Sequence, residues 1–327
     1  MASPRRDAWR RVRGVFETAA ARLGLALVPR LSRGRVLRLA RGLGSAAFLL
    51  DRRMRRVGEA NLALALGATH TTAQRRAILR GAYQDLALVF LDLLWFARET
   101  APRVAAHAGM TPALRAALDG GPRIIVTGHL GNWEILGHLF CLDGRRITTV
   151  AAPLANPALD RLLHRTRTRP GLEILARSVV VLRLLRRLRA GRTFALLLDQ
   201  NTTPEEGGVF VDFFGLPVPV SQAPALLAMR TGCPVVVCHA LPDGNGGYLA
   251  RHTAVLDPAA WGNGRDPAAV AALTAEIARQ LEADVRRWPA NWTWVYTRWK
   301  YVPPGRARDG YPFYSKRYRP PARAAGP

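Results

Sequence analysis

The sequence has few cysteines and no long apolar run, and both shortages narrow the possible classes of protein. Its three cysteines are too scattered for a disulfide framework, which favours a reducing compartment. No stretch of 18 or more uncharged apolar residues occurs, so a conventional membrane-spanning helix is not expected. No repeat of fixed period is visible, which argues against a solenoid. No Gly-x-Ser-x-Gly motif occurs, so a serine-bound acyl intermediate is not expected.

A metal site is not expected either. Cys233 and Cys238 lie near His239, but they belong to the apolar stretch TGCPVVVCHALP, which is typical of a buried strand. No second pair of ligands with the spacing of a zinc site occurs elsewhere in the sequence.

Acidic residues and lysine are scarce beside arginine. The chain has 48 Lys+Arg against 23 Asp+Glu, a formal net charge of +25, and only Lys300 and Lys316 are lysines. This charge favours an anionic partner: a phospholipid surface, an acidic carrier protein or nucleic acid. We expect no nucleic acid, because no zinc finger and no RNA-binding aromatic motif accompanies the charge.

Residues 1–100 are predicted to be mainly helical, basic and amphipathic. Apolar residues recur at helical spacing between Trp9 and Leu27, behind a cluster of arginines from Arg5 to Arg13, and the pattern repeats from Arg33 to Arg56. Such helices lie in a membrane interface or pack on a protein core. The sequence leaves both possibilities open.

From residue 120 onward, predicted strands and helices alternate. This order predicts an α/β domain over residues 101–301, with a central, mainly parallel sheet flanked by helices. Residues 302–327 are rich in Pro, Arg and Tyr, and we expect a tail that crosses the surface or is disordered. The predicted strands are Arg123–Thr127, Arg146–Ala152, Leu172–Ala176, Thr193–Leu198, Val209–Phe214, Pro234–Leu241 and Tyr248–Leu256, and the helices between and after them are Glu134–Leu142, Pro157–Arg167, Val179–Arg189, Gln222–Arg230 and Pro267–Trp288.

The stretch IIVTGHLGNWEILG places His129 and Glu134 where a strand ends and a helix begins. A carboxylate in the first helical turn can fold back to accept the proton of one imidazole nitrogen, which fixes the tautomer and raises the basicity of the other nitrogen. A histidine held in this way can deprotonate an alcohol that attacks an acyl group. The alternative is structural: His129 caps the helix, and Glu134 favours the helix dipole.

The His-x4-Glu spacing, in the local form GHLGNWE, resembles the glycerolipid-type acyltransferases, and most closely their branch that adds secondary acyl chains to lipid A. The similarity covers roughly residues 35–302. It includes RRVGEANLALAL before the catalytic domain, Asn156-Pro157 with Arg167-x3-Gly171, the blocks LDQN and GVFVDFFG, and the C-terminal WPANWTWVYTRWK. The chain has only weak basic segments where many relatives begin with a transmembrane helix, and Pro204–Gly207 differs from the usual form.

The resemblance implies a general base, His129, oriented by Glu134. It also implies that the third block lines the substrate sites, which makes Asp199 and Gln200 candidates, and we expect Asn132 to contact substrate as well. Arg167 and Arg169 could hold phosphate of the donor or of a lipid head group, or could belong to a solvated helix face. Phe210, Phe213 and Phe214 could line an acyl channel or belong to the core. The cluster of Trp288, Trp292, Trp294, Tyr296 and Trp299 could lie at a membrane interface or pack on the sheet.

The expected activity is O-acyl transfer from a thioester, on acyl carrier protein or coenzyme A, to a hydroxyl of a membrane lipid. A lipid A precursor is the first expectation, and a phosphatidylinositol mannoside or a lysophospholipid is the alternative within the same chemistry. No metal or redox cofactor is implied. We expect peripheral or shallow attachment to the cytoplasmic face of the inner membrane. A non-catalytic basic protein that binds membrane or nucleic acid is the alternative of another class.

Overall fold

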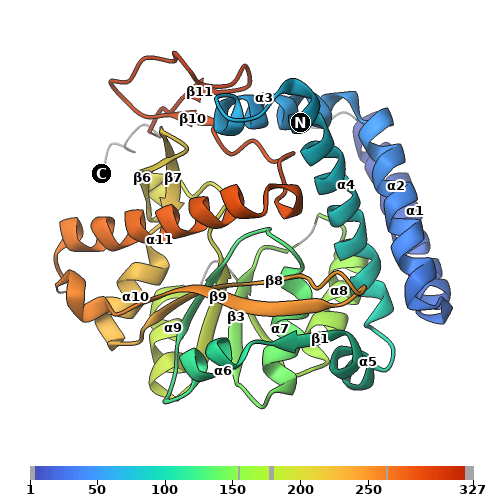
Figure 1. Cartoon of the computed structure of the whole chain (residues 1–327), viewed down its shortest axis with the longest axis horizontal. Coiled ribbons are helices and arrows are strands. Elements are labelled where there is room, and N and C mark those ends of the chain that lie inside the picture. The colour runs from blue at the N-terminus through green and yellow to red at the C-terminus, as the bar shows by residue number, and fades with distance from the viewer. Residues whose placement is uncertain (1–3, 154, 177–179, 263, 321–327) are drawn as a thin grey trace.

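The computed structural model describes residues 4–153, 155–176, 180–262 and 264–320, without the side chains of residues 4–13, 16 and 180–181. Its centre is a seven-stranded sheet with helices on both faces (Figure 1). The predicted α/β class is therefore confirmed. The side chains at the predicted apolar positions Trp9, Val12 and Phe16 and of the arginines from Arg5 to Arg13 lie outside the described parts, and so do the start of the predicted helix at Val179 and the tail beyond residue 320.

The sheet has the order β1-β9-β8-β2-β5-β3-β4, and every neighbouring pair is parallel except β8 with β9. The predicted mainly parallel sheet is thus confirmed. The carboxyl ends of its parallel strands meet at one edge, where sites gather in such folds. The strands are β1 (Ala108–Met110), β2 (Ile124–Thr127), β3 (Ile147–Ala151), β4 (Glu173–Ala176), β5 (Thr193–Leu197), β8 (Val235–Pro242) and β9 (Tyr248–Leu256).

Both faces of the central strands are buried, which explains their uninterrupted apolar sequence. In β2, Ile124 and Val126 face one core, and Ile125 faces the other. The first core is shared with α9 (Val180–Arg189), α10 (Ala223–Thr231) and α11 (Pro267–Arg287). The second is shared with α5 (Thr100–His107), α6 (Pro112–Leu118) and α7 (Trp133–Leu142). The helix α8 (Pro157–Thr168) follows β3.

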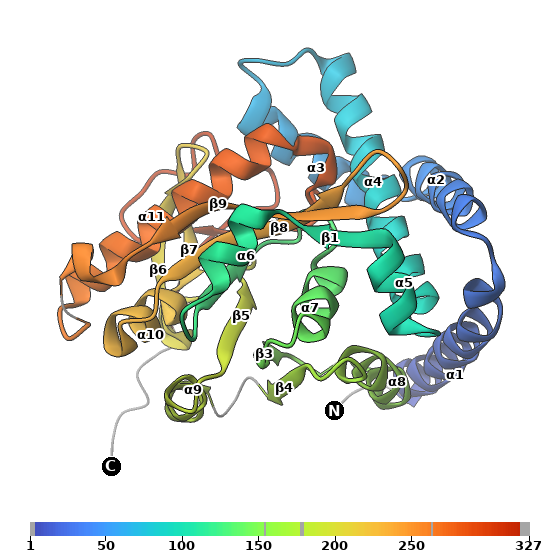
Figure 2. The same ribbon diagram turned by 60° about the horizontal axis from the view of Figure 1, so that its bottom comes forward.

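Before α5, the N-terminal region forms the helices α1 (Pro4–Leu27), α2 (Arg33–Leu50), α3 (Arg52–Leu66) and α4 (Thr72–Trp95). Figure 2 shows α1, α2 and α4 together at one end of the sheet, opposite α10 and α11. The helix α2 packs along α4 through Val36, Ala40 and Phe48. The same part of the molecule exposes large apolar side chains: Leu39, Leu43, Leu49, Leu50, Met54 and Phe90. Within the described residues, no helix is both long and apolar enough to cross a membrane.

The C-terminal segment packs on the domain. Trp292, Trp294 and Trp299 are buried against the hairpin of β6 (Gly208–Phe213) and β7 (Leu216–Ser221), so these three tryptophans pack in the core rather than at an interface. The tail crosses the surface up to residue 320, and its strand β11 (Lys316–Arg317) pairs with β10 (Tyr301–Val302). The tail is fixed because the Tyr311 hydroxyl donates to the Pro217 carbonyl at 3.0 Å.

Candidate active site

The register of two neighbouring parallel strands brings His129 to Asp199. Thr127, the last residue of β2, pairs with Leu197, the last residue of β5. His129 and Asp199 each follow two residues later, so they leave the sheet edge side by side although 70 positions separate them. The tight turn between His129 and α7 depends on Gly131, whose φ is +64° and where an added Cβ would lie 2.2 Å from the Ala240 carbonyl oxygen.

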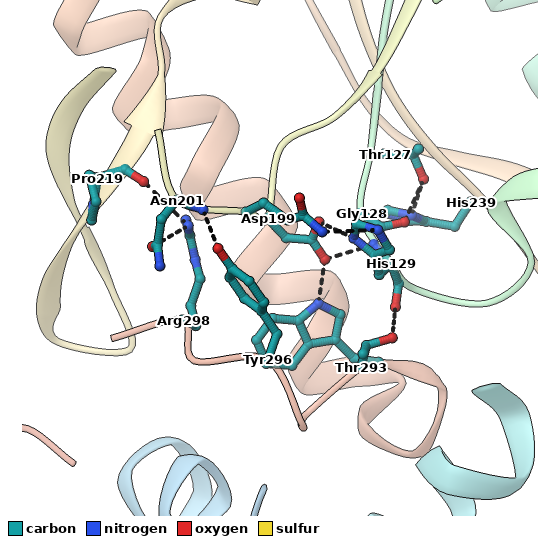
Figure 3. A network of polar contacts seen from close by, with 12 residues as sticks. Thr127, Gly128, His129, Asp199, Asn201, Pro219, His239, Thr293, Tyr296 and Arg298 are labelled. Carbon is teal, nitrogen blue, oxygen red and sulfur yellow. Dashed lines mark hydrogen bonds and ion pairs between the residues drawn. The ribbon is translucent and has the colours of Figure 1, made fainter. Parts of the chain in front are cut away.

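Asp199 holds the histidine through two hydrogen bonds (Figure 3). His129 Nδ1 lies 2.8 Å from Asp199 Oδ1, and the His129 backbone N–H donates to Asp199 Oδ2 at 2.7 Å. A buried third donor, Trp292 Nε1, reaches Asp199 Oδ2 at 2.8 Å. Since a carboxylate only accepts, Nδ1 carries the proton and Nε2 presents its lone pair to the cavities beside it.

The charges of this pair shift both pKa values in the direction of an ion pair. Burial by itself would raise the pKa of Asp199, but the charge of His129 and the three donors lower it to about 2. Burial by itself would lower the pKa of His129, but the charge and hydrogen bond of Asp199, followed by the charge of Glu134, raise it. The imidazole is therefore a stronger base than a free one.

Glu134 does not have the contact that the sequence led us to expect. In the described part of the chain no hydrogen bond joins it to His129; instead, Arg167 grips both of its carboxylate oxygens, with Nη2 to Oε1 at 2.6 Å and Nε to Oε2 at 3.0 Å. The expected orienting contact is thus corrected to Asp199. The reason is that Arg167 of α8 lies across the first turn of α7 and takes up the carboxylate, so Glu134 acts on His129 through its charge.

Of the residues expected to bind substrate, Asn132 and Arg167 instead contact other side chains of the protein. Asn132 is fully buried, where its Oδ1 caps α7 by accepting the Ile135 N–H at 3.0 Å and its Nδ2 donates to Asp92 at 3.2 Å. Arg167 is committed to Glu134. Arg169 is exposed and donates to the Ala97 carbonyl. Gln200 is exposed beside the base, with its Nε2 at 3.5 Å from His129 Nε2.

The three phenylalanines do not line a cavity at His129. Phe213 is fully buried against Trp292 and Trp299, and Phe214 packs on the same group of rings. Phe210 lies beside Tyr318 and borders a separate surface hollow with Pro303 and Pro304. The expected acyl channel is therefore corrected to core packing for Phe213 and Phe214, because β6 turns that face toward α11.

Three cavities share His129 as part of their wall. A cavity of about 650 Å³ extends over β3 and β5 toward Arg230 and Arg265. A narrow pocket of about 170 Å³ runs between the sheet and α7, past Glu134 and Leu136. An apolar groove of about 610 Å³ lies between α2, α4 and the Trp292 segment, and its wall includes Leu43, Ala87 and Phe90. One imidazole thus faces three separate binding volumes.

Sequence reasoning missed two members of the site. Trp292 was noticed only as part of an aromatic cluster, although it donates to Asp199. Arg298 is almost fully buried, and its Nη1 reaches Asn201 and the Pro219 carbonyl, each at 3.3 Å, beside the loop that follows Asp199 (Figure 3). A single arginine among so many gave no signal of its position.

Similarity to known proteins supplies the family. A protein named phosphatidylinositol mannoside acyltransferase in Mycolicibacterium smegmatis is 29% identical over 191 residues, which are 57% of this chain and 60% of that protein. The protein of the same name in Mycobacterium tuberculosis is 30% identical over 191 residues, 57% of each chain. The match therefore spans less than two thirds of these relatives.

Among solved structures, the 1-acyl-sn-glycerophosphate acyltransferase PlsC of Thermotoga maritima matches 80% of this chain and 99% of its own, at 13% identity and a TM-score of 0.36. The model of the bacterial lipid A biosynthesis acyltransferases matches residues 10–301, which include the turn at His129, the loop at Asp199 and the Trp292 segment. The chain belongs to the family of the bacterial lipid A biosynthesis acyltransferases.

Proposed function

We propose that the protein is an O-acyltransferase that moves a fatty acyl group from a thioester to a hydroxyl of a membrane lipid. The observation that carries the proposal is the Nδ1 contact of His129 with Asp199, because it leaves Nε2 unprotonated where three cavities meet. A neutral, oriented imidazole with a raised pKa suits general-base catalysis.

The reaction follows from this geometry in one direct displacement. His129 Nε2 takes the proton of the acceptor hydroxyl as its oxygen attacks the thioester carbonyl carbon. The tetrahedral intermediate collapses as the carbon–sulfur bond breaks, and the imidazolium returns the proton to the departing thiolate. Gln200 Nε2, beside the imidazole, is our candidate donor to the developing oxyanion. The charge of Asp199 stabilises the imidazolium.

We assign the three cavities by their chemistry. The cavity that ends at Arg230 and Arg265 suits the phosphate-bearing arm of a carrier protein or of coenzyme A. The narrow pocket along α7 suits the transferred acyl chain. The apolar groove between α2 and α4 suits the acyl chains of the acceptor lipid, because it opens beside the exposed Leu43 and Phe90.

Exposed apolar side chains close to this groove support peripheral attachment of the protein to a membrane. Leu49 is 61% exposed and Leu50 is 80% exposed at the end of α2, and arginines Arg52, Arg53 and Arg56 follow on α3. Apolar side chains that enter the interface, with guanidinium groups beside them, bind anionic lipid. In this placement, at the cytoplasmic face of the inner membrane, the apolar groove receives its lipid from the bilayer.

Two acceptor lipids fit this chemistry. The description of the family points to a lipid A precursor, whereas the curated relatives carry the name phosphatidylinositol mannoside acyltransferase. We propose a phosphatidylinositol mannoside as the first acceptor to test, because those relatives are 29% and 30% identical to this chain over 191 residues.

The test is an assay of the purified chain with an acyl thioester and, in turn, a phosphatidylinositol mannoside and a lipid A precursor. Mass spectrometry of the lipids and measurement of released thiol follow the transfer. We expect one acceptor to gain one acyl mass with the native protein and with His164→Ala, whose histidine is exposed on α8, but not with His129→Ala. Transfer that persists in folded His129→Ala would contradict the role of the base. Transfer to neither acceptor by the folded native protein would contradict the acceptor class.

A further inference from the structure

A basic hollow lies between α1 and α8, apart from the three cavities at His129. The two helices lie side by side in Figure 2 and are joined by Asn156 Nδ2, which donates to the Gly14 carbonyl at 2.9 Å. The hollow measures about 810 Å³, and its wall is formed by α1, the 3-10 turn after it, the loop between α4 and α5, and the last turns of α8. We call it the basic hollow for the arginines on its wall: Arg30, Arg98, Arg165 and Arg169.

The positive charge on this wall is only partly neutralised. Within the described residues, Arg98 is the one arginine of the four with a carboxylate in salt-bridge range, Glu99 at 3.8 Å, and Glu99 also faces Arg103 at 3.6 Å. Arg30 and Arg169 donate to backbone carbonyls, which carry no net charge. Glu99 is the single carboxylate among the residues of this wall, which carry four guanidinium groups, and an anion in the hollow would relieve their repulsion.

The helix α8 separates this hollow from the catalytic site. Arg167 turns inward to Glu134, whereas Arg165 and Arg169, four positions apart, share the face toward the hollow. Both are exposed, and guanidinium forks match the oxygens of phosphate. Arg167 and Arg169, which the sequence analysis treated as one pair, thus contact two different parts of the molecule.

Apolar side chains beside the hollow indicate the source of the phosphate. On α1, Leu23 is 60% exposed and Leu27 is 54% exposed. Neither lines the hollow, but both lie in the last two turns of α1, which also supply Leu25 and Ala26 to its wall. Binding of free phosphate would not require exposed apolar side chains near the arginines. Binding of a phospholipid would, because its phosphate lies at the boundary between water and the acyl chains, where exposed leucines can enter the bilayer.

We infer that the basic hollow binds the phosphate of an anionic phospholipid head group, through Arg30, Arg165 and Arg169, with Leu23 and Leu27 in the apolar layer beside it. This site goes beyond the proposed catalytic function, because it needs no acyl donor and does not include His129. It gives the chain a lipid contact at α1 and α8, in addition to the apolar groove between α2 and α4.

The experiment is calorimetric titration of the full chain with dihexanoyl phosphatidylglycerol below its micelle concentration, with dihexanoyl phosphatidylcholine and with inorganic phosphate. The test variant is Arg165→Gln/Arg169→Gln. The matched control is Arg183→Gln/Arg189→Gln on α9, which removes the same charge from exposed positions outside the hollow. Thermal melting establishes that both variants fold.

We expect saturable binding of phosphatidylglycerol, weakened about tenfold or more in the test variant and within about twofold in the control, since charge-assisted contacts are lost only in the first. Equal binding by both variants, as a lipid held in the groove at Ala87 would give, overturns the inference. Equal affinity for inorganic phosphate and phosphatidylglycerol overturns the lipid source. Because no acyl donor is present, this result is independent of whether acyl transfer is observed.

Discussion

His129 and Asp199 leave two neighbouring parallel strands at the same level, and their side chains meet with Nδ1 and Oδ1 2.8 Å apart. The carboxylate is almost fully buried, whereas the imidazole reaches the cavities. This pair, rather than His129 with Glu134, fixes the tautomer of the proposed base.

The first prediction concerns that tautomer. Asp199→Asn replaces the carboxylate with an amide, which accepts only through its one oxygen and carries no charge. His129 Nδ1 therefore loses its charged partner. We expect kcat to fall about 10³- to 10⁴-fold, as for an incorrectly held histidine in a serine protease. The measurement is steady-state kinetics with thermal melting. Asp212→Asn, on an exposed position of β6, is the control, and a loss of less than tenfold in Asp199→Asn would contradict the assignment.

The pH dependence provides the second test. A general base must be unprotonated, so activity is lost as pH falls through the pKa of His129, which lies above the usual 6.5 because of Asp199 and Glu134. Glu134→Gln removes one of these charges and should move the acid limb of kcat/KM to lower pH. An unchanged or upward-shifted limb in a folded Glu134→Gln would contradict the proposal that the charge of Glu134 raises the pKa of His129.

The third prediction concerns the hydrogen bond from Trp292 to Asp199, with Trp288→Phe as the matched control. Trp292→Phe removes the indole N–H that donates to Asp199 at 2.8 Å, and a hydrogen bond to a buried charge contributes about 1.5–3 kcal/mol. We expect lower stability and a higher pKa of Asp199 in this variant. Trp288→Phe, where the ring is only partly buried beside Arg287, should change both much less. Denaturant unfolding measures the stability and an NMR titration of the Asp199 carboxyl measures its pKa, and equal results for the two variants would argue against the contact.

Asn132 should affect folding rather than substrate binding. Asn132→Ala removes the cap of α7 and a donor to the buried Asp92, so we expect a loss of about 1–3 kcal/mol in the free energy of unfolding. Asn132→Asp keeps the cap but places a second carboxylate beside Asp92, and it should be at least as destabilising. Chemical denaturation measures both. A stable Asn132→Ala with a raised KM would restore the substrate contact that the sequence led us to expect.

The apolar groove can be blocked from α4. Ala87→Trp fills part of its wall beside Leu43 and Phe90. If the groove holds the acceptor, kcat/KM for lipid acylation should fall about tenfold, roughly 1.4 kcal/mol, while hydrolysis of the thioester by water should persist. Ala73→Trp, at an exposed position of α4 outside the groove, is the control. Equal losses of acylation and hydrolysis in Ala87→Trp would place the groove on the donor side.

Local sequence patterns determined much of the fold. The apolar run before His129, the alternation of strands and helices after residue 120, and the helical spacing in residues 1–100 are properties of neighbouring residues, and the sheet and helices follow them closely. The position of His129 at the carboxyl end of a buried strand followed from the same patterns.

Only the tertiary structure decided which side chains meet. Asp199 reaches His129 because β2 and β5 are neighbours in matching register, and strand order cannot be read from the spacing of residues. Arg167 takes up Glu134, although five positions in sequence seemed to pair that carboxylate with His129, because a folded helix α8 places a guanidinium closer. Arg169, two residues from Arg167, turns to a different hollow because successive helical positions point in different directions. The sequence determined the chemistry that was present, and packing decided how it was paired.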